Sequence, residues 1–384
     1  MANVLTNLAA DIYKAADIVA REHVGYIPAV TVNGDGSERV AKGGTVRSHF
    51  TRAATAGDRN QSMTLSQGTD QTIDNKTLTI NKDRSVEIPW TGEDVKHVNN
   101  GSGFETIQGD QIAQAMRTLS GEIEADLFAA SYAGASRAVG TAGTAPFASN
   151  LSDLGSLEQL FIDNGAPINS GQRSLIMNSA AKSSMYGLTQ LTNVNNSGDT
   201  GFLRQGIMGA LNNFDMRVSG TSASVTKGTG ASYLVNGALS EGDTAVTVDT
   251  GSGTVLAGDV ITFAGDTNKY VVTTALTGGV ITLAAPGLRQ SLADNVALTV
   301  GATYSANVSF ERSAIELAVR APALPMIGGV ARDAAVDRMM VVDPVSGIPF
   351  EIAAYLGQGK ANIQVAAAWG VKAWKNENIN ILLG

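Results

Sequence analysis

The sequence predicts an α+β protein that carries an inserted all-β domain. Strand-like segments lie on both sides of one long helical segment at residues 107–133. Residues 229–302 differ from the rest, because they hold 12 Thr, 11 Gly and 10 Val in short alternating runs separated by Gly and Asp turns. Such runs are typical of strands in a compact barrel or sandwich. An inserted domain usually adds a surface or a contact to its host, so this composition favours an assembly protein over an enzyme.

Length and composition narrow the class of protein. With 384 residues, the chain is long enough for two or three domains, and 43% hydrophobic and 16% charged residues are ordinary for a globular protein. There is no Cys, so we expect neither disulfides nor thiolate chemistry. The net charge of −8 argues against binding nucleic acid over the whole surface. We also expect no signal peptide, and no apolar run approaches the roughly 20 residues that span a bilayer.

The first ninety residues predict a short helix followed by an extended arm. Apolar residues at helical spacing predict a helix over residues 4–24, and Pro28 and the Asn33–Gly36 turn signal interrupt the chain after it. Four strand-like segments follow, at residues 45–50, 63–67, 77–80 and 85–90. Nearly fifty residues of ribbon before the first core helix suggest an arm more than a packed sheet.

This arm is basic, whereas the rest of the chain is acidic. Residues 42–84 hold seven basic and four acidic residues, a net charge of +3, so the remainder carries −11. A basic arm could dock on the acidic body of a neighbouring copy, although incidental charge on a solvated hairpin is an equal alternative. The candidate contact residues are Arg47, Arg52, Arg59, Lys76, Lys82 and Arg84.

The long helix and the segments after it are predicted from periodicity. Five apolar residues step by four, three, four and four positions along one helical face: Ile112, Met116, Leu119, Ile123 and Leu127. At ~1.5 Å per residue this helix would be about 40 Å long. An α/β part follows a Gly- and Ser-rich connection, with helices near residues 154–161 and 180–188 and strands at residues 174–177 and 214–218. In the inserted module we expect strands at residues 244–248, 260–263, 270–273 and 280–283.

After the module, the pattern predicts one more helix and several strands. The helix is expected around residues 314–319, where Ala, Glu and Leu are common. The strands are expected at residues 306–310, 339–342, 350–354, 363–367 and 379–382.

We find no constellation of residues that predicts catalysis. His23, His49 and His97 lie in separate segments without a ligand partner at metal-binding spacing. There is no phosphate-binding glycine loop of the P-loop type and no nucleophile elbow. The carboxylates of Asp35, Asp58, Asp243 and Asp249 lack the density of a calcium loop and are better explained as turn residues. We therefore predict no enzyme activity, no catalytic or metal site and no cofactor.

The order of the segments, together with three stretches of sequence, resembles one protein family. The first stretch runs from Gly43–Val46 through Val86–Thr91 and leads into the long helix. The second comprises Asn169–Asn178, Leu203–Gly209 and Asn213–Val218. The third comprises Phe310–Arg320, Asp343–Gly347 and Trp369–Lys372. Together they resemble the major capsid proteins of tailed double-stranded DNA bacteriophages, which have the Hong Kong 97-type fold. The insertion, with Gly258–Gly265, resembles the extra β-barrel domain of the lambdoid podovirus coat family. The resemblance covers essentially the whole chain.

This resemblance implies a division of the chain into named parts. They are an N-terminal arm and helix (1–42), an extended β loop (43–92), a peripheral domain with the spine helix (93–137), an axial domain (138–220), the inserted β-barrel (221–302) and a return through both domains (303–384), whose terminal strands would close the peripheral sheet. The extended loop would lie over the neighbouring subunit, and its six cations would contact that subunit.

The resemblance also implies function and partners. The chain would assemble with itself into hexamers and pentamers of an icosahedral shell. A portal protein would be a partner, and a decoration protein is a further candidate. The inner surface of the shell would contact packaged DNA weakly. Because no coiled-coil scaffold is fused to the chain, we predict a separate scaffolding protein. The location would be the virion, after assembly in the host bacterial cytoplasm, with no membrane contact. Lys76 or Lys82 could serve in the crosslinking known from related shells, although both are more simply explained as surface lysines.

Two other functions are weighed against this one. Another phage structural protein, such as a tail or decoration protein with a β-rich binding module, would explain residues 229–302 but not the long helix and the α/β part. A cytoplasmic enzyme with an appended β domain is disfavoured by the absence of a catalytic constellation.

Overall fold

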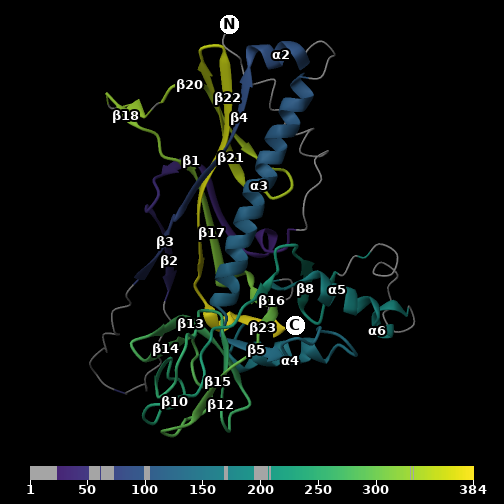
Figure 1. Ribbon diagram of the computed structural model, residues 1–384, viewed down its shortest axis with the longest axis vertical. Helices are drawn as coiled ribbons and strands as arrows, with labels where there is room; N and C mark the ends of the chain where they lie inside the picture. The colour runs from purple at the N-terminus through teal and green to yellow at the C-terminus, as the bar shows by residue number, and fades with distance from the viewer. Residues whose placement is uncertain are drawn as a thin grey trace.

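The computed structural model describes residues 24–51, 61, 73–98, 104–167, 172–193, 206, 209–328, 330, 331 and 333–384. The molecule is elongated around one long helix, α3 (Phe104–Ala133), with α2 (Gly92–Val98) near one end of it and a group of short strands near the other (Figure 1). The helix expected over residues 4–24 and the strand expected at 63–67 lie outside the described residues, apart from Val24.

A six-stranded sheet runs beside α3. Its strands follow the order β1-β17-β22-β21-β20, and β4 pairs with β22 in addition. Strand β1 is parallel to β17, and the other pairs are antiparallel. The bounds are β1 (Thr31–Val40), β4 (Lys82–Thr91), β17 (Ile315–Pro322), β20 (Ala335–Val342), β21 (Pro349–Gly357) and β22 (Lys360–Ala373). Two short helical turns and one small hairpin accompany this sheet: η1 (Ile27–Ala29), η3 (Arg312–Ala314), and β18 (Met326–Ile327) with β19 (Val330–Ala331).

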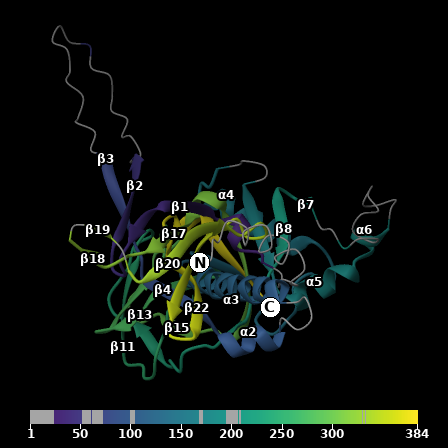
Figure 2. The ribbon, with the colours of Figure 1, turned by 90° about the horizontal axis from the view of Figure 1, so that it is seen from above.

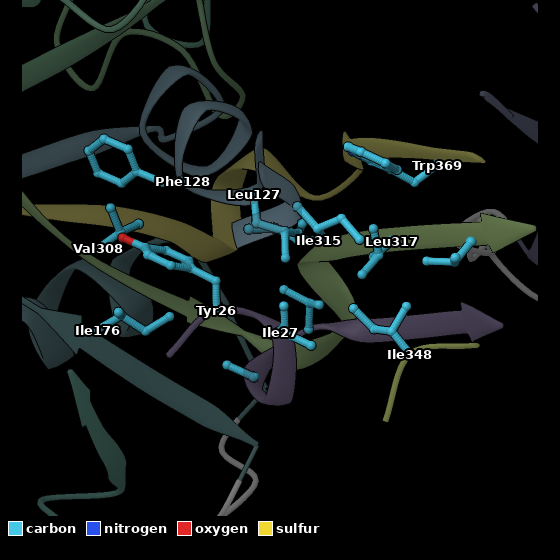
Figure 3. Close-up of a cluster of buried hydrophobic side chains, with 14 of the residues drawn as sticks. Tyr26, Ile27, Leu127, Phe128, Ile176, Val308, Ile315, Leu317, Ile348 and Trp369 are labelled. Atoms are coloured by element: carbon cyan, nitrogen blue, oxygen red, sulfur yellow. The ribbon is translucent and has the colours of Figure 1, made fainter. Parts of the chain in front are cut away.

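The predicted spine helix is confirmed as α3. The five residues predicted for its apolar face are all buried, because that face packs on the sheet. Figure 3 shows Phe128 of α3 near the ring of Tyr26 and Leu127 next to Ile315, with Trp369 farther along the same core. A helix of 30 residues in contact with several layers fixes the positions of those layers relative to one another.

The α/β part is built on a second sheet. Its strands run in the order β5-β23-β16-β6-β8-β7, and β9 pairs with β16. The strands are β5 (Arg137–Gly140), β6 (Arg173–Met177), β7 (Ala210–Leu211), β8 (Phe214–Val218), β9 (Ser224–Val225), β16 (Tyr304–Glu311) and β23 (Ile379–Leu383), and the helical segments are α4 (Ser152–Asp163), α5 (Ser179–Tyr186), α6 (Thr189–Thr192) and η4 (Asn376–Asn378). A separate apolar cluster around Phe161 and Phe214 forms its core, so the predicted helices and strands of this part are confirmed.

Residues 233–300 form a closed ring of six strands. The pairings run β12-β15-β10-β11-β14-β13, and β13 returns to pair with β12. The strands are β10 (Tyr233–Val235), β11 (Ala245–Asp249), β12 (Val260–Phe263), β13 (Lys269–Thr277), β14 (Val280–Leu283) and β15 (Ala297–Val300). The ring encloses its own apolar cluster, which includes Val246, Ile261 and Phe263. Of the two architectures left open by the sequence, the structure therefore has the barrel.

Two local predictions are wrong. Residues 314–319 were expected to be helical, but Ile315 begins strand β17, which lies between β1 and β22. This central strand is buried on both faces, so it lacks the alternation of a half-exposed strand, and the charged Glu316 and Arg320 are buried with its apolar residues. The Asn33–Gly36 turn signal lies instead inside β1, where the register with β17 shifts between Asp35 and Arg39. Three residues of β1, Gly36 to Glu38, have no partner on β17 at this irregularity, and the strand continues past it instead of turning.

The last strand lies in a different sheet from the strands that precede it. Strands β20, β21 and β22 lie together in the six-stranded sheet. Strand β23 pairs with β16 and β5, so the end of the chain belongs to the α/β part. The turn η4 lies between β22 and β23, where the chain crosses from one sheet to the other. That the terminal strands close a peripheral sheet stays a prediction.

One buried carboxylate joins the N-terminal segment to the spine helix. Glu124 of α3 is 1% exposed and accepts hydrogen bonds from the backbone N–H groups of Gly25, Tyr26 and Ile27 at 2.6, 2.8 and 3.0 Å. It also accepts one from the Ser219 hydroxyl, just after β8, at 2.8 Å. Three segments that are distant in sequence therefore converge on one side chain, and the negative charge is compensated by four donors.

We predict that Glu124→Ala lowers the free energy of unfolding by about 3 kcal/mol or more, because it leaves several buried donors without an acceptor. Urea unfolding of the monomer measures this change. Glu122→Ala is the matched control: it lies on the same helix but removes only an exposed ion pair, which contributes about 0–1 kcal/mol. A loss for Glu124→Ala no larger than that of the control would contradict the role assigned to Glu124.

Candidate assembly surfaces

A two-stranded ribbon projects from the body of the molecule. Strands β2 (Thr45–Thr51) and β3 (Ile73–Thr79) pair antiparallel over seven residue pairs, and within the described residues they form a sheet of their own. Figure 2 shows the two strands leading away from the rest of the chain. Both outer edges of the ribbon therefore carry backbone N–H and C=O groups that another chain could pair with.

The root of this ribbon is fixed to the body by a small apolar cluster. Val46, Leu78 and Ile80 pack against two alanines of β17 and β22. The contact is close at Gly370 of β22, where a Cβ atom would lie 2.2 Å from the carbonyl oxygen of Thr79. Backbone hydrogen bonds between Ile80 and the Gly43–Gly44 turn close the base. This cluster and these hydrogen bonds hold the root of the ribbon against the body.

Trp374 adds a polar contact at the same root. Its indole ring lies 5.3 Å from the ammonium group of Lys76 on β3 and 4.8 Å from that of Lys372. Its Nε1–H donates to Glu316 of β17 at 2.8 Å. Cation–π contacts at such distances contribute about 0.5–1 kcal/mol at exposed sites. The indole ring therefore links the ribbon to β17.

The structure separates the six predicted contact cations into three groups. Arg52 and Arg59 lie outside the described residues. Arg47 and Lys76 lie on the ribbon, on β2 and β3. Lys82 and Arg84 lie instead on β4, inside the six-stranded sheet.

Lys82 and Arg84 already have carboxylate partners in their own chain. The guanidinium of Arg84 donates two hydrogen bonds of 2.9 Å to Glu122, which lower the pKa of that carboxyl. The ammonium of Lys82 lies 2.9 Å from Asp126, whose other oxygen accepts from the Trp369 indole at 2.8 Å. Both cations thus hold β4 against α3, and a contact of either with a neighbouring subunit would compete with these pairs.

An apolar edge of the six-stranded sheet is a second candidate surface. Strand β20 ends the sheet order and pairs with β21 alone among the described strands. Val336, Met340 and Val342 are 45%, 37% and 49% exposed there. Sequence reasoning missed this surface, where Val336, Met340 and Val342 share one side of the strand with Arg338. Alternation alone does not show which face is covered.

A charged network lies beside these apolar residues, because Glu351 of β21 is the cross-strand partner of Met340. Glu351 of β21 is buried and lies 2.5 Å from both Arg39 of β1 and Arg338 of β20. Arg338 also contacts Asp333 at 2.6 Å. Partial burial by itself would raise the pKa of Asp333, but hydrogen bonds from Tyr355, the Ala335 N–H and Arg338 outweigh it and lower the pKa to about 2. The network joins three strands of the sheet.

The barrel is attached to the body at the end of α3. Gly258 lies against the ring of Tyr132, so that a Cβ atom there would be 2.5 Å from the ring, and its carbonyl accepts from the Tyr304 hydroxyl at 2.6 Å. Next to it, Asp259 is buried and accepts from the N–H groups of Gly228 and Leu256. Burial raises the pKa of Asp259, and these hydrogen bonds partly offset that effect. These contacts fix the barrel against the end of α3.

The described part of the chain has few clusters of side chains that could bind a metal ion or take part in catalysis. Among those residues, no group of three or more His, Asp or Glu side chains could hold a metal ion. No helix there is long and apolar enough to span a membrane. The features that stand out are surfaces: the ribbon, the β20 edge and the barrel.

Comparison of the sequence with known families and proteins finds no match. No family model matches the chain, and no curated protein matches it.

Solved structures do match. A chain in the capsid structure of the Cyanophage P-SCSP1u is 9% identical and aligns over 95% of this chain and 89% of its own length, with a TM-score of 0.52. A chain from the asymmetric unit of the bacteriophage PhiM1 mature capsid (8% identity, coverage 95% and 88%) and one from Mycobacterium phage Che8 (14%, 89% and 85%) have TM-scores of 0.46 and 0.44. Scores below 0.5 carry no weight, so the conclusion depends on the first match: the chain shares the mixed α+β fold of that capsid chain.

We predict that Gly370→Ala displaces the root of the ribbon, because the added Cβ would overlap the Thr79 carbonyl. Overpacking of this kind costs typically about 1–3 kcal/mol. Limited proteolysis should cleave the segment between β2 and β3 several-fold faster than in the wild type. Gly357→Ala in the same sheet is the control, since its added Cβ would lie no closer than 3.6 Å to another atom. Equal cleavage rates in the two variants would refute a tight root at Gly370.

We also predict a stability change at acidic pH that depends on Asp333. Its pKa is lower in the folded chain than the usual value near 3.9, so its ionised form stabilises the fold above about pH 4, and this contribution is lost as the pH falls toward 2. Because the site is partly solvated, we expect a contribution of about 1 kcal/mol. The difference in unfolding free energy between wild type and Asp333→Asn should shrink between pH 5 and pH 2. A constant difference would exclude the proposed pairing.

Proposed function

We propose that this chain is the major capsid protein of a tailed double-stranded DNA bacteriophage and has the Hong Kong 97-type fold. In this function it assembles with itself into hexamers and pentamers of an icosahedral shell that encloses packaged DNA. The observation that carries the proposal is the fold shared with a phage capsid chain over 95% of the present sequence. The spine helix, the projecting ribbon and the two sheets are consistent with it.

The ribbon supplies the physical basis for assembly. Within the described residues, its root packs on the body and its two strands pair with no other strand. A ribbon that lies on the next copy makes a heterologous contact, which closes into a ring when the rotation between copies allows it. Since an exposed ion pair contributes only about 0–1 kcal/mol, most of the affinity must come from β pairing and from the many contacts in a ring.

The contact residues that we propose on this ribbon are Arg47, Arg52, Arg59 and Lys76. Their role would be to meet acidic surface on the neighbouring copy, and the excess of acidic residues elsewhere in the chain supports this. The sequence also predicts Lys82 and Arg84 as residues that contact the neighbouring copy. Their pairs with Asp126 and Glu122 favour a role within the subunit instead.

The barrel is proposed to be an inserted domain, similar to that of lambdoid podovirus coat proteins. Its closed ring of strands and its separate apolar cluster support this. The division into extended loop, peripheral domain and axial domain is proposed on the same basis, with the six-stranded sheet as the peripheral part and the α/β part as the axial one.

Partners follow from this function. A separate scaffolding protein, a portal protein and weakly bound packaged DNA are the expected ones, and a decoration protein is a further candidate. The chain would act in the virion after assembly in the host bacterial cytoplasm, as a structural protein and not as an enzyme.

Electron microscopy of the expressed chain tests the proposal. With the scaffolding protein encoded beside it, we expect closed shells of uniform size, whereas the chain alone should give capsomers or irregular assemblies. The triple variant Arg47→Glu, Arg52→Glu and Arg59→Glu should reduce shell yield at least several-fold, and high salt should weaken wild-type assembly, because both oppose the proposed ion pairs. An unchanged melting temperature of the monomer controls for misfolding.

Two outcomes are decisive. Only compact monomers or dimers under all conditions would rule out a shell protein. Uniform shells from the chain alone would leave the shell function intact but exclude the need for a separate scaffold.

A further inference from the structure

A polar cavity lies where the barrel meets the α/β part. It has a volume of about 320 Å³ and opens between α4, β5 and the loop before β13. Figure 1 places α4 and β5 next to the barrel, at the same end of α3. Seven side chains with polar groups line it: Arg137, Ser156, Gln159, Asp163, Thr267, Asn268 and Lys269. Both parts of the molecule therefore contribute to its walls.

The buried guanidinium of Arg137 is incompletely compensated there. Arg137 is 3% exposed, and its two Nη groups donate to Asn164 at 2.9 Å, to Asn268 at 3.3 Å and to the Leu160 carbonyl at 3.4 Å. Its one carboxylate partner among the described residues is Asp163, at 3.5 Å. Its Nε–H is buried and has no acceptor in the described chain. A buried polar group of this kind normally has a partner, so the described residues compensate this guanidinium only in part.

A second cation lines the same cavity. Lys269 lies at the first position of β13, and its ammonium donates to the carbonyl oxygen of Gly140 on β5. Among the described residues, no carboxylate forms an ion pair with this ammonium group. Nearby Asp266 is already engaged by the Tyr270 hydroxyl and by Asn268. Two ammonium protons of Lys269 thus stay available for another acceptor.

We propose that this cavity binds a phosphate group. A tetrahedral oxyanion offers the several acceptor oxygens that a guanidinium, an ammonium and hydroxyl groups can share, and charge-assisted hydrogen bonds to it are stronger than neutral ones. The ligand would contact Arg137 and Ser156 on one side and Thr267 and Lys269 on the other. Its binding would therefore fasten the barrel to the α/β part.

Isothermal titration calorimetry of the full chain with inorganic phosphate, at constant ionic strength in chloride, tests the site. We expect saturable binding with one phosphate per chain and a rise in melting temperature that follows the phosphate concentration. Lys269→Gln should weaken binding at least tenfold. Lys360→Gln, which removes the same charge at the exposed start of β22, should bind like the wild type.

A second variant has the opposite expected effect. Asp163→Asn removes the one carboxylate that faces the ligand, so phosphate should bind several-fold more tightly. This gain cannot result from a loss of folding. A short single-stranded oligonucleotide identifies the source of the group: competition with phosphate assigns the site to a nucleic-acid backbone, and lack of competition assigns it to a free anion.

Both results of this competition, a nucleic-acid backbone or a free anion as the source of the phosphate, agree with the proposed site. Absence of saturable phosphate binding, or equal affinities in Lys269→Gln, Lys360→Gln and Asp163→Asn, would overturn the proposal. This outcome would leave the assembly function untouched, because the ribbon and the β20 edge lie on other parts of the chain.

Discussion

The carboxylate of Glu124 is the contact on which the arrangement of the molecule most depends. It receives the N-terminal segment and the end of β8 on one side of α3, whereas Asp126 and Glu122 of the same helix hold β22 and β4 through Trp369, Lys82 and Arg84. Carboxylates within one turn of a helix therefore bind four segments from different regions of the sequence. Apolar packing buries the helix, and these directional contacts fix its position against both sheets.

The two projecting parts are attached in different ways, and this difference bears on their roles. The ribbon has a small apolar root and one indole contact, so it can reach another copy while its own strands stay paired. The barrel has a core of its own, a strand pairing between β13 and β5, and tyrosine contacts with Gly258. The ribbon, which is attached by few contacts, suits contact between subunits. The barrel, which is attached by several contacts, suits stabilisation of its own subunit.

Much of the fold could be predicted because local patterns and tertiary packing agree there. The face of α3 through Ile112 and Leu127 is buried as its spacing indicates, and strand Phe214–Val218 has the expected bounds. Where the local pattern and the tertiary packing favour different structures, the segment adopts the structure that the packing favours. The segment after Ala314 has helix-forming residues but is a strand, because its buried Glu316 and Arg320 find partners in neighbouring segments, including Trp374 and Asn33.

The sequence by itself determined the class of most elements, the position of the all-β module and the basic character of the segment that contains the ribbon. Composition and period depend on neighbours along the chain, so they can be read without a structure. Only the tertiary structure decided that Lys82 and Arg84 pair within the subunit, that β20 exposes its apolar side, and that Arg137 and Lys269 share a cavity. Each of these depends on which distant segments meet, and strand pairing across hundreds of residues leaves no local signature.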